Sequence, residues 1–249
     1  MTPAPLVTVA VPSYNQGRYL DQALESIFAQ DVAVEVFVVD ADSTDNTKAV
    51  IERWKPRLAG WRSHRDSGQS AAINEGIARG SAPYVAWLNS DDWLEKGAYR
   101  RLIAALDSDP SAPMAYGRAW NVDERSGKKT SVFVRPFSER LMAQLNLIPQ
   151  PATLVRRASW RSVDGVNESL QMAMDYDLWW KLYRKLGRPA FVDEFLATNR
   201  EHPTTKTGTR RRQHYDEAIG VVRKHYGRVP LKWYLAQPYA VWYRSLIGK

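Results

Sequence analysis

Short apolar runs alternate with amphipathic helical patterns through the first 110 residues of this chain. The runs that have the length and composition of strands are residues 6–11 (stopped by Pro12), 34–39, 61–64 and 84–88. The segments with apolar side chains at helical spacing are residues 16–30, 44–56, 70–79 and 96–106. Strands and helices that alternate in this way favour an α/β fold with a parallel, doubly wound sheet.

The second half is less regular. Two strand patterns flank a Ser126-Gly127 turn and predict a hairpin. The later elements that we expect are a short run at 152–155, a helix over 175–186 ended by Gly187, an extended segment at 191–198, a flexible loop at 204–209 and a basic helix over 210–226.

Composition limits the class of protein. With 249 residues and 44% hydrophobic content, the chain can bury one large core or two small ones. No apolar run approaches the ~20 residues that span a bilayer, and the first 15 residues lack the basic region of a signal peptide. The chain has no cysteine, which excludes disulfides and thiolate metal sites and suits a reducing cytoplasm.

The formal charge of +8 is unevenly distributed. Carboxylate clusters lie mostly before Asp177, whereas the C-terminal stretch is rich in Lys, Arg, Trp and Tyr. A basic, aromatic tail can serve nucleic acid, an anionic membrane surface or a phosphorylated substrate, so charge alone does not choose between them.

Polar, ligand-type residues follow each of the four strand candidates, at 12–15, 40–43, 66–69 and 89–92. Each segment by itself has the composition of an ordinary turn. In a parallel sheet, however, all four converge on one rim, where α/β proteins bind ligands. The adjacent pair Asp91 and Asp92 is costly to hold together unless a cation or hydrogen bonds offset the repulsion. The sequence therefore predicts a divalent-metal site that carries a phosphorylated substrate.

These motifs, in this order, resemble the family 2 inverting glycosyltransferases. The matching stretches are Val11-Pro12-Ser13-Tyr14-Asn15, Val38-Val39-Asp40, Ser43-Thr44-Asp45, Asp66-Ser67-Gly68-Gln69-Ser70, Asn74-Glu75-Gly76 and Leu88-Asn89-Ser90-Asp91-Asp92. The match continues, less securely, through Gln150-Pro151-Ala152-Thr153, Asp175-Tyr176-Asp177-Leu178-Trp179 and Arg200-Glu201-His202.

The resemblance implies a GT-A fold, an αβα sandwich around a mostly parallel mixed sheet, here with added C-terminal helices. Residues 1–110 would bind the nucleotide-sugar, and residues 111–205 would bind the acceptor and contain the catalytic base. A basic, aromatic helical tail would follow at 206–249. The implied reaction moves a sugar, with inversion, from a UDP- or dTDP-sugar to a hydroxyl of a glycan or lipid-linked acceptor.

The resemblance also implies site residues. The donor nucleotide would contact Pro12, Tyr14, Asn15, Asp40, Asp66, Gln69, Asn74 and Asp91. Tyr14 would offer its aromatic face to the base, Asp40 would accept the base's ring N–H, and Asp91 would meet the ribose. Asp92 would ligate Mn²⁺ or Mg²⁺ on the diphosphate, with His202 as a weaker candidate ligand.

An inverting transfer needs a general base, and the family's acidic motif falls on Met174-Asp175-Tyr176-Asp177. The resemblance assigns Asp175 as the base, although Met174 stands where the family has an acid. A helix cap is the alternative role for Asp175, and Asp177 fits a residue that interacts with the helix dipole.

Two other functions stay open at this point: a non-catalytic nucleotide-sugar sensor on the same fold, and a basic nucleic-acid-binding module. The carboxylates at the strand ends argue against the second, because they would repel phosphate in the absence of a metal. The aromatic tail at 231–244 fits either a membrane interface or a packed core. We therefore expect a cytoplasmic protein, which the first alternative would attach to the inner face of a membrane.

Overall fold

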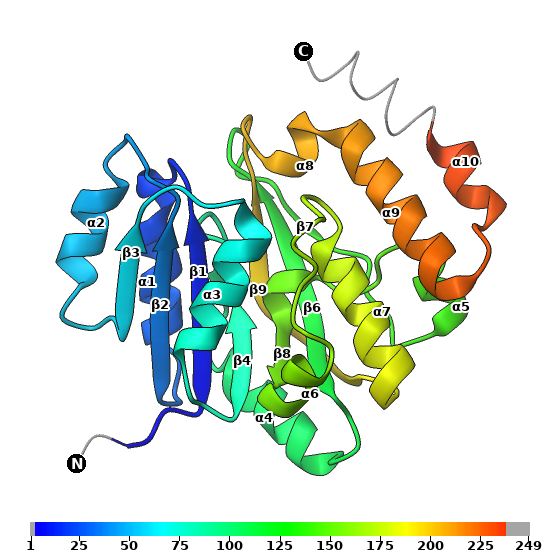
Figure 1. Cartoon of the computed structure of the whole chain (residues 1–249), viewed down its shortest axis with the longest axis horizontal. Helices are drawn as coiled ribbons and strands as arrows, with labels where there is room; N and C mark the ends of the chain where they lie inside the picture. The colour runs from blue at the N-terminus through cyan, green and yellow to red at the C-terminus, as the bar shows by residue number, and fades with distance from the viewer. Residues whose placement is uncertain (1–2, 238–249) are drawn as a thin grey trace.

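The computed structural model describes residues 3–237 as an α/β fold built on a nine-stranded mixed sheet (Figure 1). The strands follow the order β3-β2-β1-β4-β8-β6-β9-β5, and β7 pairs with β6 outside this path. Their bounds are β1 Val7–Ser13, β2 Val34–Asp40, β3 Gly60–Ser63, β4 Tyr84–Trp87, β5 Trp93–Leu94, β6 Met114–Asp123, β7 Lys129–Ser131, β8 Thr153–Arg156 and β9 Ala190–Glu201.

The helices cover both faces of this sheet, as the αβα prediction requires. Their bounds are α1 Gly17–Phe28, α2 Thr47–Trp54, α3 Gln69–Arg79, α4 Ala98–Ser108, α5 Glu139–Met142, α6 Arg157–Ser162, α7 Met174–Leu186, α8 Lys206–Thr209, α9 Arg211–Tyr226 and α10 Leu231–Gln237, with a 3-10 turn at Gln150–Ala152. The two sides have separate cores because successive side chains of a strand point to opposite faces. In β1, Val7, Val9 and Val11 pack with α1, α2 and α4, whereas Ala10 packs with α3 and α7.

The first four strands form the parallel half of the sheet. Strands β2 and β4 both pair in parallel with β1, and β3 pairs in parallel with β2. Beyond β4 the sheet is mixed, because β8 is antiparallel to both β4 and β6 while β6 and β9 are parallel. The loops after β1, β2, β3 and β4 therefore meet at one edge, as the sequence predicts.

Pro12 does not end the first strand, so that prediction is wrong. Strand β1 continues to Ser13, with Pro12 opposite Val39 of β2. Neighbouring residues of a strand direct their backbone groups to opposite sides, and the carbonyl of Ser13 accepts a hydrogen bond from Ala41 on the β2 side. The missing N–H of Pro12 therefore faces the other side, where β4 pairs only as far as Ala10.

Four further differences concern short elements. The strand β5 and the helices α5 and α6 have no separate signal in the sequence, and residues 206–209 of the expected loop form the helix α8. Each has six residues or fewer, too few to show a period. In the described part of the tail, Trp233 is buried in the core with α7 and α9, whereas residues 238–249 of the tail prediction lie outside the described residues.

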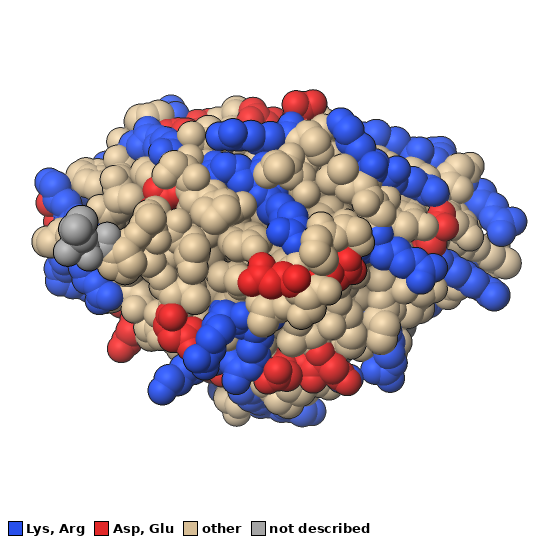
Figure 2. All heavy atoms as spheres, turned by 90° about the horizontal axis from the view of Figure 1, so that it is seen from below, with Lys and Arg blue, Asp and Glu red and all other residues tan. Residues whose placement is uncertain are grey.

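Charged side chains of both signs are interspersed on the face seen in Figure 2, so the net charge is not gathered there into one basic patch. Among residues 3–237, no helix combines the length and apolar character needed to cross a bilayer.

Candidate active site

The loops after β1 and β2 are tied to each other by short polar contacts. Asn15 adopts a left-handed backbone conformation (φ 53°), and its Oδ1 accepts a hydrogen bond from the backbone N–H of Thr44 at 2.8 Å. Its own N–H donates to Ser43 Oγ at 2.7 Å. Asparagine tolerates this conformation better than most residues. Pro12 is buried, and Tyr14, in the loop after β1, has 61% of its surface exposed. The aromatic face of Tyr14 is therefore free to receive a ligand.

Asp40 ends β2 as a fully buried carboxylate. Its Oδ2 accepts hydrogen bonds from the Ser43 backbone N–H at 3.0 Å and from Ser63 Oγ at 2.6 Å, and the Ser43 hydroxyl donates to Oδ1. These donors offset the cost of burying the charge and fix the carboxylate between two loops.

Arg62, to which the sequence analysis assigned no role, organises the third loop. The Nη1 of this buried side chain donates to the carbonyls of Asp40 and His64, at 2.6 and 2.7 Å. Its Nη2 pairs with Asp66 at 2.9 Å and Glu75 at 2.7 Å. The other oxygen of Asp66 accepts the Gly68 N–H at 2.9 Å. Asp66 thus shapes the loop through Arg62.

Two more donor-site candidates lie on α3. Gln69, its first residue, donates from Nε2 to Asn89 Oδ1 at 2.8 Å and so reaches the loop after β4. Asn74, further along the helix, binds the backbone of Val166 with both its Nδ2 and its Oδ1, at 2.9 and 3.1 Å. The described contacts of Asn74 thus fix the 166–168 segment, and its role as a donor contact stays a prediction.

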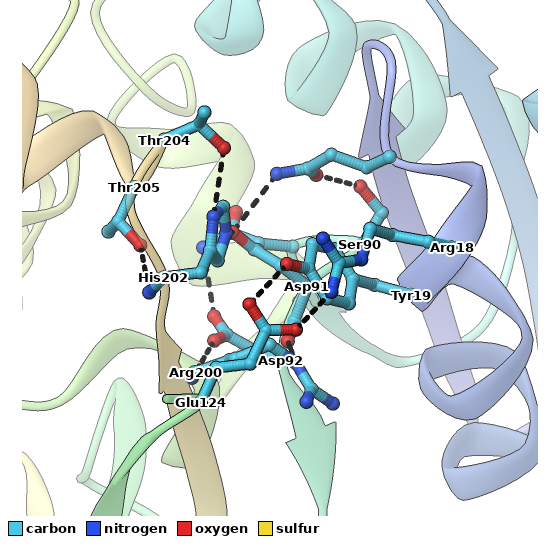
Figure 3. Close-up of polar contacts among 12 residues, drawn as sticks. Arg18, Tyr19, Ser90, Asp91, Asp92, Glu124, Arg200, His202, Thr204 and Thr205 are labelled. Atoms are coloured by element: carbon cyan, nitrogen blue, oxygen red, sulfur yellow. Dashed lines mark hydrogen bonds and ion pairs between the residues drawn. The ribbon is translucent and has the colours of Figure 1, made fainter. Parts of the chain in front are cut away.

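The adjacent pair Asp91 and Asp92 has two different environments (Figure 3). Asp91 Oδ2 lies 3.0 Å from His202 Nε2 and accepts a hydrogen bond from Gln16 Nε2 at 3.0 Å. Asp92 is buried, and its carboxylate accepts the backbone N–H of Arg200 at 3.0 Å and Nδ2 of Asn89 at 3.2 Å. Burial, and then the charge of Asp91, raises the pKa of Asp92 well above its usual value. The hydrogen bonds from Arg200 and Asn89 oppose this rise without cancelling it.

Arg200 holds the acidic loop from β9, which pairs with the strand β5 that follows this loop. Besides the contact to Asp92, its Nε donates to the Asp91 carbonyl at 3.1 Å, and its guanidinium lies over the rings of Tyr19 and Trp93, 4.8 Å from each centroid. Tyr19 in turn donates to Glu124 at 2.9 Å. The sequence contains the Arg200-Glu201-His202 motif, but it gives no sign that Arg200 contacts Asp92, 108 residues away.

The donor set suits a divalent cation only in part. Among the described residues, no group of three or more His, Asp or Glu side chains is arranged to hold a metal. His202 Nε2 faces Asp91 and Nδ1 lies 2.9 Å from Thr204 Oγ1, so as a ligand it would have to give up one of these contacts. A buried Asp92 with an acidic neighbour nevertheless fits a cation that takes most of its ligands from substrate phosphates and water, as Mg²⁺ does. Asp92 could therefore supply one ligand to such an ion.

Asp175 is the second residue of the helix α7, after Met174. Its Oδ2 accepts a hydrogen bond from Asn146 Nδ2 at 3.0 Å, and its Oδ1 accepts the Tyr176 N–H at 2.7 Å. Burial raises the pKa of Asp175, and these hydrogen bonds together with His214 oppose the rise. Met174 packs in the apolar core, where an acid would lack a partner. A carboxylate that holds its proton more tightly than usual is a stronger base, which is the property that a general base requires.

Asp177, two residues further along the helix, has the opposite character. Its Oδ1 lies 3.0 Å from Lys224 Nζ and 2.7 Å from His225 Nε2, both on α9. Burial favours the neutral acid, but the hydrogen bonds and charges of these two partners outweigh it and lower the pKa of Asp177. Asp177 thus joins α7 to α9.

The segment that leads into α7 packs against the loop after β3 and the start of α3. Ser70 Oγ donates to the Leu170 carbonyl at 2.8 Å, and a Cβ at Gly68 would lie 2.8 Å from Gln171 Oε1. A larger residue at position 68 would displace the end of the Gln171 side chain and would be strained, because φ there is 122°. On its other side, the start of α7 borders a cavity of about 320 Å³ lined by Asn146, Tyr176, His214, Tyr215 and Trp233, among others.

Comparison with known proteins identifies the family. The profile of Glycosyl transferase family 2 matches residues 8–163, which include all four rim loops. The chain belongs to glycosyl transferase family 2. This family match ends before Asp175 and His202, so it does not assign roles to either residue.

Curated proteins from bacteria are similar over most of this chain. Chondroitin synthase of Escherichia coli is 28% identical over 182 residues, which are 72% of this chain and 26% of that protein. An uncharacterized glycosyltransferase of Rickettsia typhi is 27% identical over 219 residues, or 84% of this chain and 68% of that protein. The chain thus matches about a quarter of the length of chondroitin synthase.

Two solved structures share the fold. TarS of S. aureus, solved with UDP-GlcNAc, has a TM-score of 0.71 at 21% identity, over 92% of this chain and 68% of the TarS chain. The mannosyltransferase PcManGT of Pyrobaculum calidifontis, solved with GDP-Man and Mn²⁺, has a TM-score of 0.68 at 20% identity, over 98% and 74% of the two chains. These similarities confirm the GT-A fold.

Proposed function

We propose that this protein is an inverting glycosyltransferase, in which the nucleotide-sugar donor binds at the rim formed by β1 to β4 and Asp175 acts as the base. The observation that carries the proposal is the environment of Asp175. A partly buried carboxylate with a raised pKa lies in the first turn of α7, and the segment before it packs against the loop at Gly68. This arrangement suits a base that acts on a second substrate beside a bound donor.

In this mechanism the protein holds the donor at its nucleoside and at its diphosphate. Tyr14 stacks on the nucleobase, Asp40 accepts the ring N–H of the nucleobase, and Asp91 meets the ribose. The nucleoside pocket is completed by Pro12, Asn15, Asp66, Gln69 and Asn74. Asp92, with His202 as a second candidate, would hold Mn²⁺ or Mg²⁺, which neutralises charge on the departing diphosphate when bound. Asp175 takes the proton of the acceptor hydroxyl while that oxygen attacks the anomeric carbon. The bond to the nucleoside diphosphate breaks on the opposite face, and its electron pair leaves with the diphosphate.

A second part of the proposal concerns the nucleobase and the sugar of the donor. We propose a UDP- or dTDP-sugar, as the family resemblance implies, and a glycan or lipid-linked hydroxyl as acceptor. The similar structures contain both UDP-GlcNAc and GDP-Man, so a donor screen has to include guanosine nucleotides.

A donor screen by thermal unfolding in Mn²⁺ tests the first half of the function, because a ligand that binds the folded state raises its apparent stability. Product analysis by NMR then tests transfer, and an inverted anomeric configuration is expected. Donor binding without transfer to any of a broad set of acceptors would favour a nucleotide-sugar sensor. Retention of configuration would contradict the inverting mechanism.

We also propose that the C-terminal helix contacts an anionic membrane at the cytoplasmic face. Leu231, Tyr234 and Leu235 of α10 are 68%, 45% and 70% exposed and share one side of the helix, opposite the buried Trp233. Apolar side chains beside Lys232 suit an interfacial helix. Co-sedimentation with anionic vesicles, but not with neutral ones, is expected, and Leu235→Glu should weaken it. Equal sedimentation of the wild-type protein with and without vesicles would exclude the contact.

A further inference from the structure

Lys206, the first residue of α8, carries a partly buried ammonium group for which the described structure offers little compensation. Its Nζ donates to Oε1 of Gln69 at 3.1 Å, a neutral amide oxygen. Burial lowers the pKa of Lys206, the charge of Arg210 lowers it further, and the attraction of Glu217 is too weak to restore it.

A second partly buried lysine, Lys181, has compensating contacts that Lys206 lacks. Lys181 Nζ donates to the carbonyls of Val163 and Gly165 at 2.9 and 2.5 Å and lies 3.9 Å from the carboxylate of Asp177. Its position is explained by the residues that it holds together. An ammonium group has three hydrogens to donate, and burying one beside a single neutral acceptor is costly. The position of Lys206 is explained if an anion binds next to it.

The partner of Lys206 leads directly into the acidic loop. Gln69 donates from Nε2 to Asn89 Oδ1 at 2.8 Å, and Asn89 donates from Nδ2 to Asp92 Oδ2 at 3.2 Å. A continuous series of hydrogen bonds thus runs from the lysine on α8 to Asp92. It crosses the start of α3, whose first turn contains no acidic residue and has no side-chain cap. An anion beside Lys206 at the start of α3 would meet positive charge from both the ammonium group and the helix dipole.

We propose that Lys206 binds the diphosphate of the donor and stays with the nucleoside diphosphate after transfer. The inference rests on the proposed function, because the anion is the donor's own. Gln69 holds the amine toward the acidic loop before the donor arrives, and the diphosphate then provides the charged acceptors that the amine lacks. Lys206 thus gives the helix α8 a direct contact with the leaving group.

The experiment compares diphosphates with nucleosides. Uridine, thymidine and guanosine diphosphates are titrated into the wild-type protein and Lys206→Met by calorimetry in Mn²⁺, and so are the corresponding nucleosides. Methionine keeps much of the length of the side chain and removes its charge. Hydrogen bonds to charged groups contribute roughly 1.5–3 kcal/mol. A diphosphate that binds the wild-type protein should therefore bind about 10- to 100-fold more weakly to the variant, while nucleoside binding stays unchanged.

Lys55→Met is the matched control. Lys55 follows α2 at the end of the sheet away from the rim, pairs with Glu52 and is exposed. Its loss removes the same charge from the protein and should leave diphosphate affinity unchanged. Lys206→Arg, which keeps the charge, should retain most of the affinity.

The outcomes separate the two proposals. Wild-type affinity for the diphosphate in Lys206→Met overturns the role of Lys206 and leaves the proposed function intact. A wild-type protein that binds none of the three diphosphates overturns both. Equal weakening in Lys206→Met and Lys55→Met would mean that only overall charge matters, and it would also overturn the specific contact.

Discussion

Replacing Asp175 by asparagine removes the proposed base and leaves the shape of the side chain nearly unchanged. The amide oxygen of the introduced asparagine can still accept the Tyr176 N–H, now at 2.7 Å, and its NH2 group can donate to Asn146 once the Asn146 amide, which now donates at 3.0 Å, flips. What the introduced asparagine cannot do is take a proton from the acceptor. Proton transfer by a positioned general base contributes roughly 10²- to 10⁴-fold to a rate, or about 3–5 kcal/mol of barrier. We expect kcat to fall by that factor while donor affinity stays unchanged.

The same substitution should not destabilise the fold. Burial raises the pKa of Asp175 in the folded protein. A carboxyl whose folded pKa lies above its unfolded value lowers stability once the pH exceeds the folded pKa, because the native state then has to hold a charge that it disfavours. At neutral pH Asp175→Asn relieves this cost, so its thermal midpoint should equal or exceed that of the wild-type protein.

Asp177→Asn is the matched control on the same helix. The pKa of Asp177 is lowered by His225 and Lys224, so its charge stabilises the native state. Losing it should cost about 1.5–3 kcal/mol, the usual value of hydrogen bonds to charged groups. Single-turnover transfer and thermal unfolding of both variants are the assays. An Asp175→Asn variant with turnover within tenfold of wild type, or one less stable than Asp177→Asn, would refute the reasoning.

Three further predictions concern other buried charges. In the wild-type protein, the charge of Asp177 stabilises the fold fully above its unfolded pKa near 4, and this stabilisation is lost as the pH falls through its lower folded pKa. Lys224→Met removes one of the partners that lower this pKa, so acid unfolding of the variant should begin at a higher pH. Asp92→Asn should weaken diphosphate binding in Mn²⁺ and change it little in EDTA; unchanged affinity in Mn²⁺ would remove Asp92 as the metal ligand. Arg62→Met leaves Asp66 without its ion-pair partner and Glu75 with Arg79 alone. It should lower the free energy of unfolding by roughly 3–5 kcal/mol in urea titrations, whereas a loss below about 1 kcal/mol would show that the loop does not depend on Arg62.

The pH dependence of turnover offers an independent test of the base. Asp175 has to be ionised to accept a proton, and burial raises its pKa. The acid limb of kcat should therefore lie above about pH 4, the region of an ordinary aspartate. A profile that stays flat through that region would point to another base.

The sequence by itself determined the parallel half of the sheet and the rim at which we propose that the donor binds. Those elements are written in local patterns, since apolar runs and helical spacing lie within about ten to fifteen neighbouring residues. Parallel strands then bring Tyr14, Asp40, Gln69 and Asp91 to one rim, whatever the remaining chain does. The short element β5 and the helix α8 lacked such a signal.

Only the tertiary structure decided how the charges on that rim are held. Arg200 reaches Asp92 across 108 residues of sequence, and Lys206 reaches Gln69 across 137. Neither contact follows from periodicity, because each depends on the path of β9 and of the loop after it. The same holds for Asp175 and Asp177, two aspartates in one helical turn. Their neighbours Asn146 and His225 come from distant segments; the first limits the rise in the pKa of Asp175, and the second helps to lower the pKa of Asp177.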